Sequence, residues 1–220
     1  MAAWLLLALV AVPLAPEPVV PTLTLVWHDS ARCFPAVGLE RLGNEVEALF
    51  RDYGISVRFH AASENEDLQK IPEPRVNAVV LPGEDRFRTA PNAMAAALGE
   101  RGGKYGIFVF FDSVRRTLGY RGNDLSPRHT YELSRALARV VAHEVVHVLA
   151  PSRGHAESGL MTEKLTRDLL LTDRIELDGP SLALAVAAMK EWRPPARTSA
   201  SPAIRTIFEP EVPPLWPSVR

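Results

Sequence analysis

The sequence contains a single cysteine, Cys33, among its 220 residues, so no disulfide can form within the chain. It also lacks an excess of charge of either sign, because 25 lysine and arginine residues are balanced by 26 aspartate and glutamate residues. No basic patch with interleaved aromatic residues is present, so we expect no nucleic-acid partner. Internal repeats are absent too. The length allows one domain with a full hydrophobic core and short appendages.

The N-terminus lacks an apolar run long enough to form a full transmembrane helix. Residues 2–12 are all apolar, a length that suits the core of a signal peptide. We predict that residues 1–15 are a signal peptide, or an N-terminal membrane tether if uncleaved, and that the protein is secreted or held in the cell envelope. Residues 16–21 are predicted to be a linker. Residues 193–220, rich in proline and serine and without hydrophobic periodicity, are predicted to be a disordered tail.

The remaining residues, 22–192, alternate between strand and helix patterns. Residues 93–98 fit either a short helix or a loop that crosses the sheet, and residues 112–124 fit a connection. The last helix is apolar nearly all round, which indicates that it packs against the core. Strands are predicted at 22–27, 55–59, 77–81 and 105–111, helices at 39–53 and 127–150, a short helix or turn at 163–171, and the last helix at 181–192 after a cap at Asp178 or Gly179.

The chemistry is concentrated in one stretch, which begins with His-Glu-Val-Val-His at residues 143–147. Ser126 followed by Pro127 is a helix start signal, and Pro151 ends the helix. In a helix this spacing places both imidazoles on one face, about one turn apart, where they can hold one zinc ion. Glu144 lies about 100° further round, so it reaches a water bound to that ion. The pattern predicts a zinc hydrolase.

A polar stripe on the opposite face of the same helix stops at Arg139. Beyond it only the two histidines and Glu144 are polar, so this end of the helix enters the interior. Buried polar groups need partners, and a metal ion is an economical one. A pair of satisfied core histidines is the alternative, but the helix cap, the apolar surroundings and a third histidine favour the metal site. The stripe consists of Arg128, Glu132, Arg135 and Arg139.

The third histidine, His155, follows His147 by eight residues, and a Gly-Leu-Met turn at 159–161 comes soon after. With these residues the chain resembles the metzincin clan of zinc peptidases, and more narrowly small secreted bacterial metzincin-like proteins. The resemblance implies an α+β fold with a mixed, mostly parallel twisted sheet, a backing helix, an active-site helix and a small helical C-terminal subdomain. It also implies zinc ligation by His143, His147 and His155, with Met161 packed beneath the metal.

Some residues depart from the clan's pattern. Ala150 and Pro151 replace its helix-ending glycine, Val146 replaces the glycine before the second histidine, and Ala156 replaces the serine after the third. The spacer before the third histidine is two residues longer than the commonest one. The chain has no tyrosine after Tyr131, so the tyrosine that assists some metzincins has no counterpart. These changes spare the predicted ligands and alter the surroundings of the substrate cleft.

Other residues compete for the same roles. A gluzincin-like fold would use Glu163 or Glu176 as the third ligand, and an aspzincin-like site would use Asp168. By the resemblance, Gly106–Phe110 would be the sheet edge that pairs with an extended substrate; the alternative, which the sequence does not separate from it, is a plain buried strand. The weak likeness of the Cys33 segment to an inhibitory pro-peptide is outweighed by its interpretation as a small, partly buried residue. Three histidines are interpreted as surface or loop residues: His28, His60 and His129.

We therefore predict a monomeric zinc-dependent metalloendopeptidase with one Zn2+ per chain and a peptide or protein substrate. Glu144 would take a proton from the zinc-bound water and pass it to the leaving amine. The alternative is an exported, non-catalytic zinc-binding module of the cell envelope. Glu144 favours the enzyme, because a structural zinc site needs no general base and is closed by a fourth protein ligand.

Overall fold

The computed structural model describes residues 22–72, 74–83, 93–99, 105–121 and 125–192. The predicted signal segment, linker and tail lie outside these residues. No helix in the described part of the chain is long and apolar enough to cross a membrane.

One five-stranded sheet forms the centre of the domain, with the strand order β2-β1-β3-β5-β4. Three of its pairings are parallel, and β4 pairs antiparallel to β5 at one edge. The sheet is therefore mixed and mostly parallel, as the resemblance implied. The strands are β1 (Leu23–His28), β2 (Val57–Ala61), β3 (Arg75–Leu81), β4 (Ala95–Gly99) and β5 (Tyr105–Phe110).

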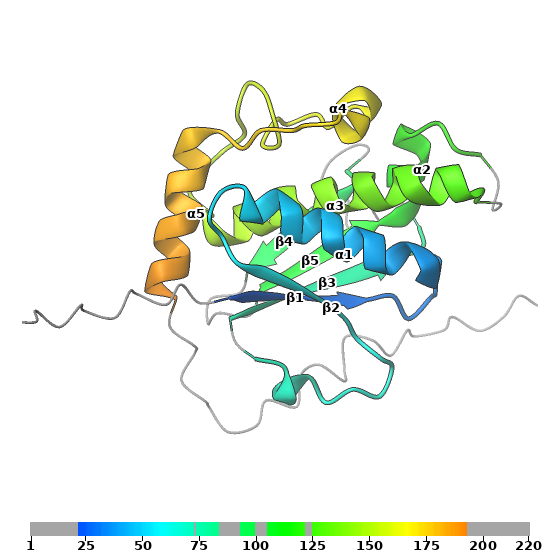
Figure 1. The fold of residues 1–220 in the computed structure, drawn as a ribbon, viewed down its shortest axis with the longest axis horizontal. Helices are drawn as coiled ribbons and strands as arrows, with labels where there is room; N and C mark the ends of the chain where they lie inside the picture. The colour runs from blue at the N-terminus through cyan, green and yellow to red at the C-terminus, as the bar shows by residue number, and fades with distance from the viewer. Residues whose placement is uncertain (1–21, 73, 84–92, 100–104, 122–124, 193–220) are drawn as a thin grey trace, which may run out of the picture.

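Two long helices, α1 (Ala36–Arg51) and α3 (Pro127–Leu149), cover the same face of the sheet and pack against each other (Figure 1). Their apolar faces meet alternate strand residues, such as Leu23, Leu25 and Ile107, which are fully buried. Such burial is the main driving force for this two-layer arrangement. The shorter helices are η1 (a 3-10 helix, Leu68–Lys70), α2 (Phe111–Thr117), α4 (Arg167–Leu171) and α5 (Gly179–Glu191). The predicted α+β fold class is confirmed.

Two predictions near β4 are wrong. The segment 93–98 is expected from the sequence to be a short helix or loop, but its residues 95–98 belong to the edge strand β4. Alanine favours helices in isolation, but hydrogen bonding to β5 overrides that preference here. Because β4 covers β5, the segment Gly106–Phe110 is not the sheet edge that the resemblance implied. The connection expected at 112–124 begins with helix α2, whose apolar spacing at Phe111, Val114 and Leu118 signals a helix.

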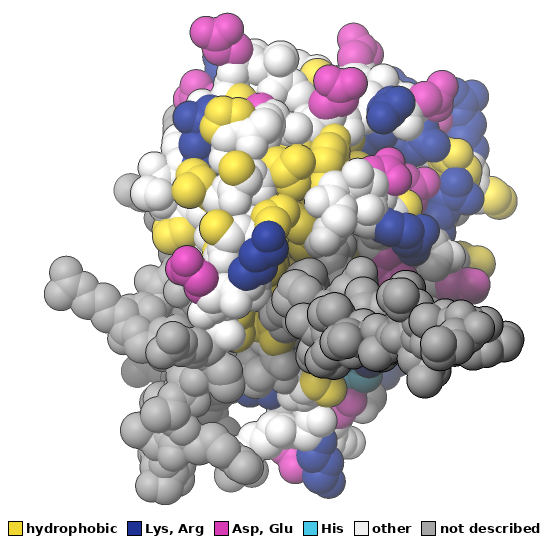
Figure 2. Space-filling model, turned by 60° about the vertical axis from the view of Figure 1, so that its left-hand side comes forward, with side chains coloured by type: hydrophobic (Ala, Val, Ile, Leu, Met, Phe, Trp, Pro, Cys, Tyr) yellow, Lys and Arg dark blue, Asp and Glu magenta, His cyan; other side chains and the backbone are white. Residues whose placement is uncertain are grey.

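The last helix packs by one face only. Ser181, Ala185 and Met189 of α5 are buried, whereas Leu184 on the outer face is 42% exposed. The prediction that its near-continuous apolar sequence lies against the core is therefore wrong for the outer half of the helix. Figure 2 brings this end of the molecule forward and shows apolar side chains exposed on it between charged ones.

The polar stripe of α3 faces solvent only at its first residue, Arg128, whose side chain is 82% exposed. Arg139 is 3% exposed, and its guanidinium donates hydrogen bonds to the carbonyl oxygens of Leu169 (2.8 Å) and Thr172 (2.5 Å). Arg135 donates to the carbonyl oxygen of Leu171 at 3.3 Å. These arginines supply donors to carbonyl groups at the end of α4, which the helix cannot satisfy itself. The stripe thus attaches the C-terminal segment to α3.

Candidate metal centre

Helix α3 carries two of the three clustered histidines. It begins as predicted, with Ser126 as the N-cap accepting a hydrogen bond from the backbone N–H of His129 (3.2 Å) and Pro127 in the first turn. Its last turns are buried, and His143 is 6% exposed. The apolar residues around the motif hold this end of the helix rigidly against the sheet, so the two imidazoles have fixed positions.

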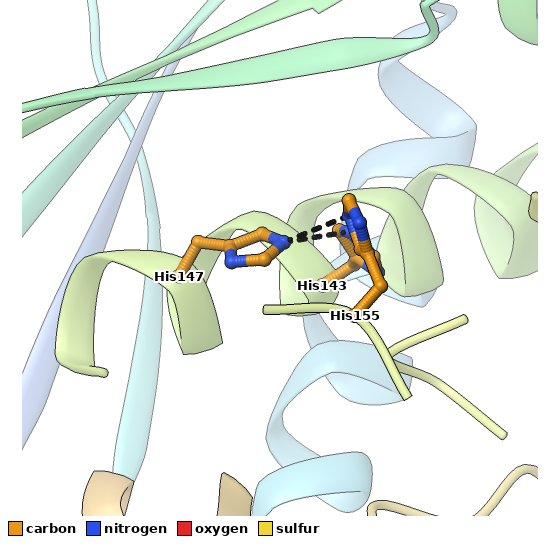
Figure 3. A group of neighbouring side chains, drawn as sticks. All are labelled: His143, His147 and His155. Carbon is orange, nitrogen blue, oxygen red and sulfur yellow. Dashed lines mark hydrogen bonds between the residues drawn. The ribbon is translucent and has the colours of Figure 1, made fainter. Parts of the chain in front are cut away.

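The Nε2 atoms of His143, His147 and His155 converge on one point (Figure 3). Nε2 of His147 lies 3.1 Å from Nε2 of His143 and 3.3 Å from Nε2 of His155. All three ligand atoms lie within 4.8 Å of one another. The rings come from α3 and from the loop that follows it, so the turn after Pro151 brings His155 back to the helix.

Two backbone carbonyl groups determine which ring nitrogens carry protons. The carbonyl oxygen of Leu160 lies 2.7 Å from Nδ1 of His143 and can only accept, so Nδ1 donates. The carbonyl of Arg153 accepts a hydrogen bond from His147, and because Nε2 of His147 faces the other histidines, the donor is Nδ1. In the neutral rings, both Nε2 atoms therefore carry lone pairs.

This arrangement fits a zinc ion. Two lone pairs that face each other at 3.1 Å repel, and a cation bound by both removes the repulsion. Tetrahedral zinc with Zn–N bonds of about 2.05 Å requires ligand nitrogens about 3.3 Å apart, close to the two observed separations. Burial, together with the neighbouring His147 and His155, lowers the pKa of His143 to about 4. His143 is therefore neutral at pH 7, the form that binds metal.

Glu144 lies beside the cluster on the same helix. Burial raises the pKa of its carboxyl group to about 7, although the backbone N–H of Ala97 on β4 donates a hydrogen bond to it that acts to lower the pKa. A cation at the three histidines would also act to lower the pKa of Glu144, since it favours the charged carboxylate. The helix thus places a proton acceptor of near-neutral pKa next to the metal ligands and beside the edge strand.

The turn that contains Met161 contacts the cluster through the carbonyl oxygen of Leu160, which lies 2.7 Å from Nδ1 of His143. Gly159 has a φ of +79°, and a Cβ atom at this position would lie 2.3 Å from the carbonyl oxygen of Glu176. That carbonyl accepts a hydrogen bond from the N–H of Leu160 (2.7 Å), and the N–H of Ala156 donates to the carbonyl of Met161 (2.7 Å). Met161 is fully buried. Only glycine fits this close approach, which directs the Leu160 carbonyl towards His143.

The structure does not bring the competing ligand candidates to the cluster. Among the described residues, no acidic side chain and no cysteine joins the three histidines in a group that could hold a metal ion. The other histidines make contacts elsewhere. His28 of β1 contacts Asn77 (3.2 Å) and His60 of β2 contacts Glu66 (2.8 Å). The ring of His129 lies against the ring of Tyr120. Burial raises the pKa of the Cys33 thiol to about 12, so the free thiol is protonated at pH 7. The excluded acidic candidates are Glu163, Asp168 and Glu176.

Three contacts of the site could not be read from the sequence, because backbone groups make them. They are the carbonyl oxygens of Leu160 and Arg153 and the N–H of Ala97. A backbone group leaves no signal in the residue pattern unless a glycine marks the approach, as Gly159 does beside Leu160.

Comparison with solved structures finds similar proteins, among them a zinc-dependent peptidase and an archaemetzincin. A zinc-dependent peptidase from Methanocorpusculum labreanum is 14% identical, with 74% of this chain and 99% of that chain covered and a TM-score of 0.49. An archaemetzincin from Methanopyrus kandleri is 16% identical, with 80% and 99% covered and a TM-score of 0.46. No family model matches the chain, and no curated protein matches it either. What the site can do therefore follows from its own geometry.

Proposed function

We propose that this protein is a zinc-dependent metalloendopeptidase, with His143, His147 and His155 as the ligands of one zinc ion. The observation that supports this most directly is the convergence of three Nε2 atoms beside a carboxylate of near-neutral pKa. Three neutral ligands leave the fourth position of a tetrahedral ion for water, as in catalytic zinc sites, whereas structural sites are closed by four protein ligands.

Glu144 is the general base in this proposal. Zinc bound at the histidines would supply a Lewis acid that polarises a water molecule and a peptide carbonyl. The Glu144 carboxylate takes a proton from the attacking water and returns it to the leaving amine, a role in which burial raises its pKa and so its basicity, and a bound cation would oppose that rise. The hydrogen bond from the Ala97 N–H orients the carboxylate during this transfer.

The outer edge of β4 is the place where an extended peptide would lie. The carbonyl of Met94 accepts a hydrogen bond from the N–H of Phe110 (2.8 Å), so Met94 faces β5. By strand alternation, the backbone groups of Ala95 and Ala97 point away from the sheet. The N–H of Ala97 is taken by Glu144, so a substrate strand would pair with the backbone groups of Ala95 and the carbonyl of Ala97, and would pass along Glu144. We further propose that the domain is exported, on the basis of the apolar residues 2–12.

Zinc content and hydrolysis, measured together on the full-length protein, test the proposal. We expect one zinc ion per chain by mass spectrometry, retained in Glu144→Gln and lost in His155→Ala, and cleavage of a mixed peptide library that both variants lose. His129→Ala is the matched control, since His129 lies on the same helix outside the cluster, and it should keep both properties. Zinc without cleavage would favour the non-catalytic zinc-binding module, and absence of zinc would refute the metal site.

A further inference from the structure

The loop between the second and third histidines receives little support from the hydrophobic core. Pro151, Ser152, Gly154 and His155 are exposed, and Arg153 alone within 151–155 is partly buried. Gly154 has no neighbouring atom within 4 Å of the place where a Cβ atom would be. On the far side of His155, Ala156 packs against the core and donates its N–H to the carbonyl of Met161 (2.7 Å). On the near side apolar packing holds little of residues 151–155, so polar contacts must set the path of the chain from the helix to His155.

The side chain of Arg153 makes such contacts with the start of helix α5. Its Nη2 lies 3.3 Å from Oδ1 of Asp178, and its Nε lies 3.4 Å from the hydroxyl oxygen of Ser181. Asp178 is the N-cap of α5, and its Oδ1 also accepts a hydrogen bond from the N–H of Ser181 (3.0 Å). Ser181 is fully buried, so the guanidinium is attached to a rigid part of the domain.

Arg153 stabilises the partly buried carboxylate of Asp178. Its other oxygen, Oδ2, is buried and has no hydrogen-bond partner within the described part of the chain. Burial alone would raise the pKa of Asp178, but the hydrogen bonds from Ser181 and Arg153 outweigh it and lower the pKa below its ordinary value. A partly buried carboxylate with a single satisfied oxygen favours a nearby cation strongly, which keeps the ion pair closed.

The backbone of the same arginine reaches the metal ligands. Its carbonyl group accepts the hydrogen bond from His147 that makes Nε2 the free nitrogen of that ring. Its N–H donates to the carbonyl of Ala150 (2.9 Å), which forms the turn after the helix. One residue therefore connects the N-terminus of α5 to one histidine through hydrogen bonds and to the next, His155, through two peptide bonds.

We infer that Arg153 is a positioning residue for the zinc site, an assignment that rests on the proposed function. Its ion pair with Asp178 holds the exposed loop in the conformation that presents His155 to the metal and directs the Arg153 carbonyl towards His147. In this chain the segment between His147 and His155 is long, and no glycine ends helix α3. The attachment of Arg153 to α5 therefore helps to direct the chain back towards the helix. Mutation of residues that orient metal ligands by hydrogen bonds typically lowers the metal affinity by about 10- to 100-fold.

Zinc affinity, measured on the full-length protein by competition with a chromophoric chelator, tests this role. Arg153→Ala should weaken zinc binding roughly 10-fold or more, and should change the visible absorption spectrum of the cobalt-substituted protein, which reports ligand geometry. Arg153→Lys keeps the charge opposite Asp178 and should recover part of the affinity. Arg174→Ala, at an exposed arginine near α5, is the matched control and should leave both readouts unchanged.

The melting temperature of the metal-free variants separates positioning from general stability. We expect the metal-free Arg153→Ala protein to melt within a few degrees of the unaltered protein, with the main loss in zinc affinity. Unchanged affinity and cobalt spectrum in Arg153→Ala, with or without a lower melting temperature, would overturn the inference and leave the proposed function intact. If the unaltered protein bound no zinc, the proposed function and this inference would both fall.

Discussion

Nδ1 of His143 donates a hydrogen bond of 2.7 Å to the carbonyl oxygen of Leu160. This bond joins helix α3 to the turn that contains Met161, and it leaves Nε2 of His143 free for a metal ion. Its geometry depends on Gly159, which precedes Leu160 with a positive φ and lies directly against the carbonyl of Glu176. The turn, the helix and the ligand atom are therefore coupled through one backbone group.

Gly159→Ala should destabilise the domain by at least about 2 kcal/mol, because the new Cβ atom meets the Glu176 carbonyl and the positive φ disfavours alanine. Urea denaturation of the metal-free protein measures this loss. Gly154→Ala is the control, since nothing lies within 4 Å of that position, and it should change the free energy of unfolding by less than about 0.5 kcal/mol. Equal stabilities of the two variants would contradict the close approach.

Metal removal should lower the melting temperature, because zinc that binds only the folded state stabilises it by mass action. Free zinc at 100 times its dissociation constant corresponds to about 2.7 kcal/mol. A thermal melt before and after treatment with a chelator, followed by zinc addition, measures the effect. Glu144→Gln should respond like the unaltered protein, whereas His155→Ala should lose most of the response. A full response in His155→Ala would indicate that another side chain completes the site.

Glu132→Gln should destabilise the domain in a pH-dependent way. The hydrogen bond from the Tyr120 hydroxyl, followed by that from Arg128, lowers the pKa of Glu132 below 4.5. A lowered pKa contributes stability that is complete above the ordinary pKa and is lost as the pH falls through the folded-state value. The variant should therefore be less stable by about 1 kcal/mol at pH 7.

That deficit should shrink as the pH falls below about 4.5. Urea denaturation at pH 7 and at successive lower pH values measures it. Tyr120→Phe removes the first donor and keeps the ring, so its deficit should fade over the same range. A deficit in Glu132→Gln that is constant with pH would show that packing, and not the charge of Glu132, is responsible.

The sequence predicted most of the fold, because the elements that define it have strong local signals. Helix α3 has a cap, a first-turn proline and a long apolar face, and strands β1, β3 and β5 are apolar runs bounded by turns. Strand β4 is alanine-rich and short, so only its pairing with β5 makes it a strand. The outer face of α5 is apolar in sequence yet exposed, and no periodicity distinguishes it from a buried face.

The candidate site, like the fold, was predictable from the sequence only in part. The spacing of His143, Glu144 and His147 predicts their shared position on one helix, and the structure brings His155 to them. The contacts of Ala97, Leu160 and Arg153 arise where distant segments meet through backbone groups, which residue identity does not encode. Zinc binding, one ion per chain, the monomeric state and export stay predictions.

Ala97→Pro tests the connection between the edge strand and the general base. Proline removes the N–H that donates to Glu144, and that N–H points away from β5, so the sheet should tolerate the change at an edge. Because the lost hydrogen bond favoured the charged carboxylate, the pKa of Glu144 should rise. The acid limb of the kcat/KM profile should therefore move to higher pH, and kcat/KM at pH 7 should fall roughly 10-fold.

Ala96→Pro is the matched comparison one residue earlier. By alternation its N–H faces β5, as Met94 does through the bond from Phe110, so this proline should break the ladder and lower the melting temperature. Ala97→Pro should instead keep its melting temperature and its zinc content while hydrolysis falls. If both variants lost stability equally, Ala97 would serve the sheet and not Glu144. If Ala97→Pro kept full hydrolysis with an unshifted pH profile, the carboxylate would need no orientation by the edge strand.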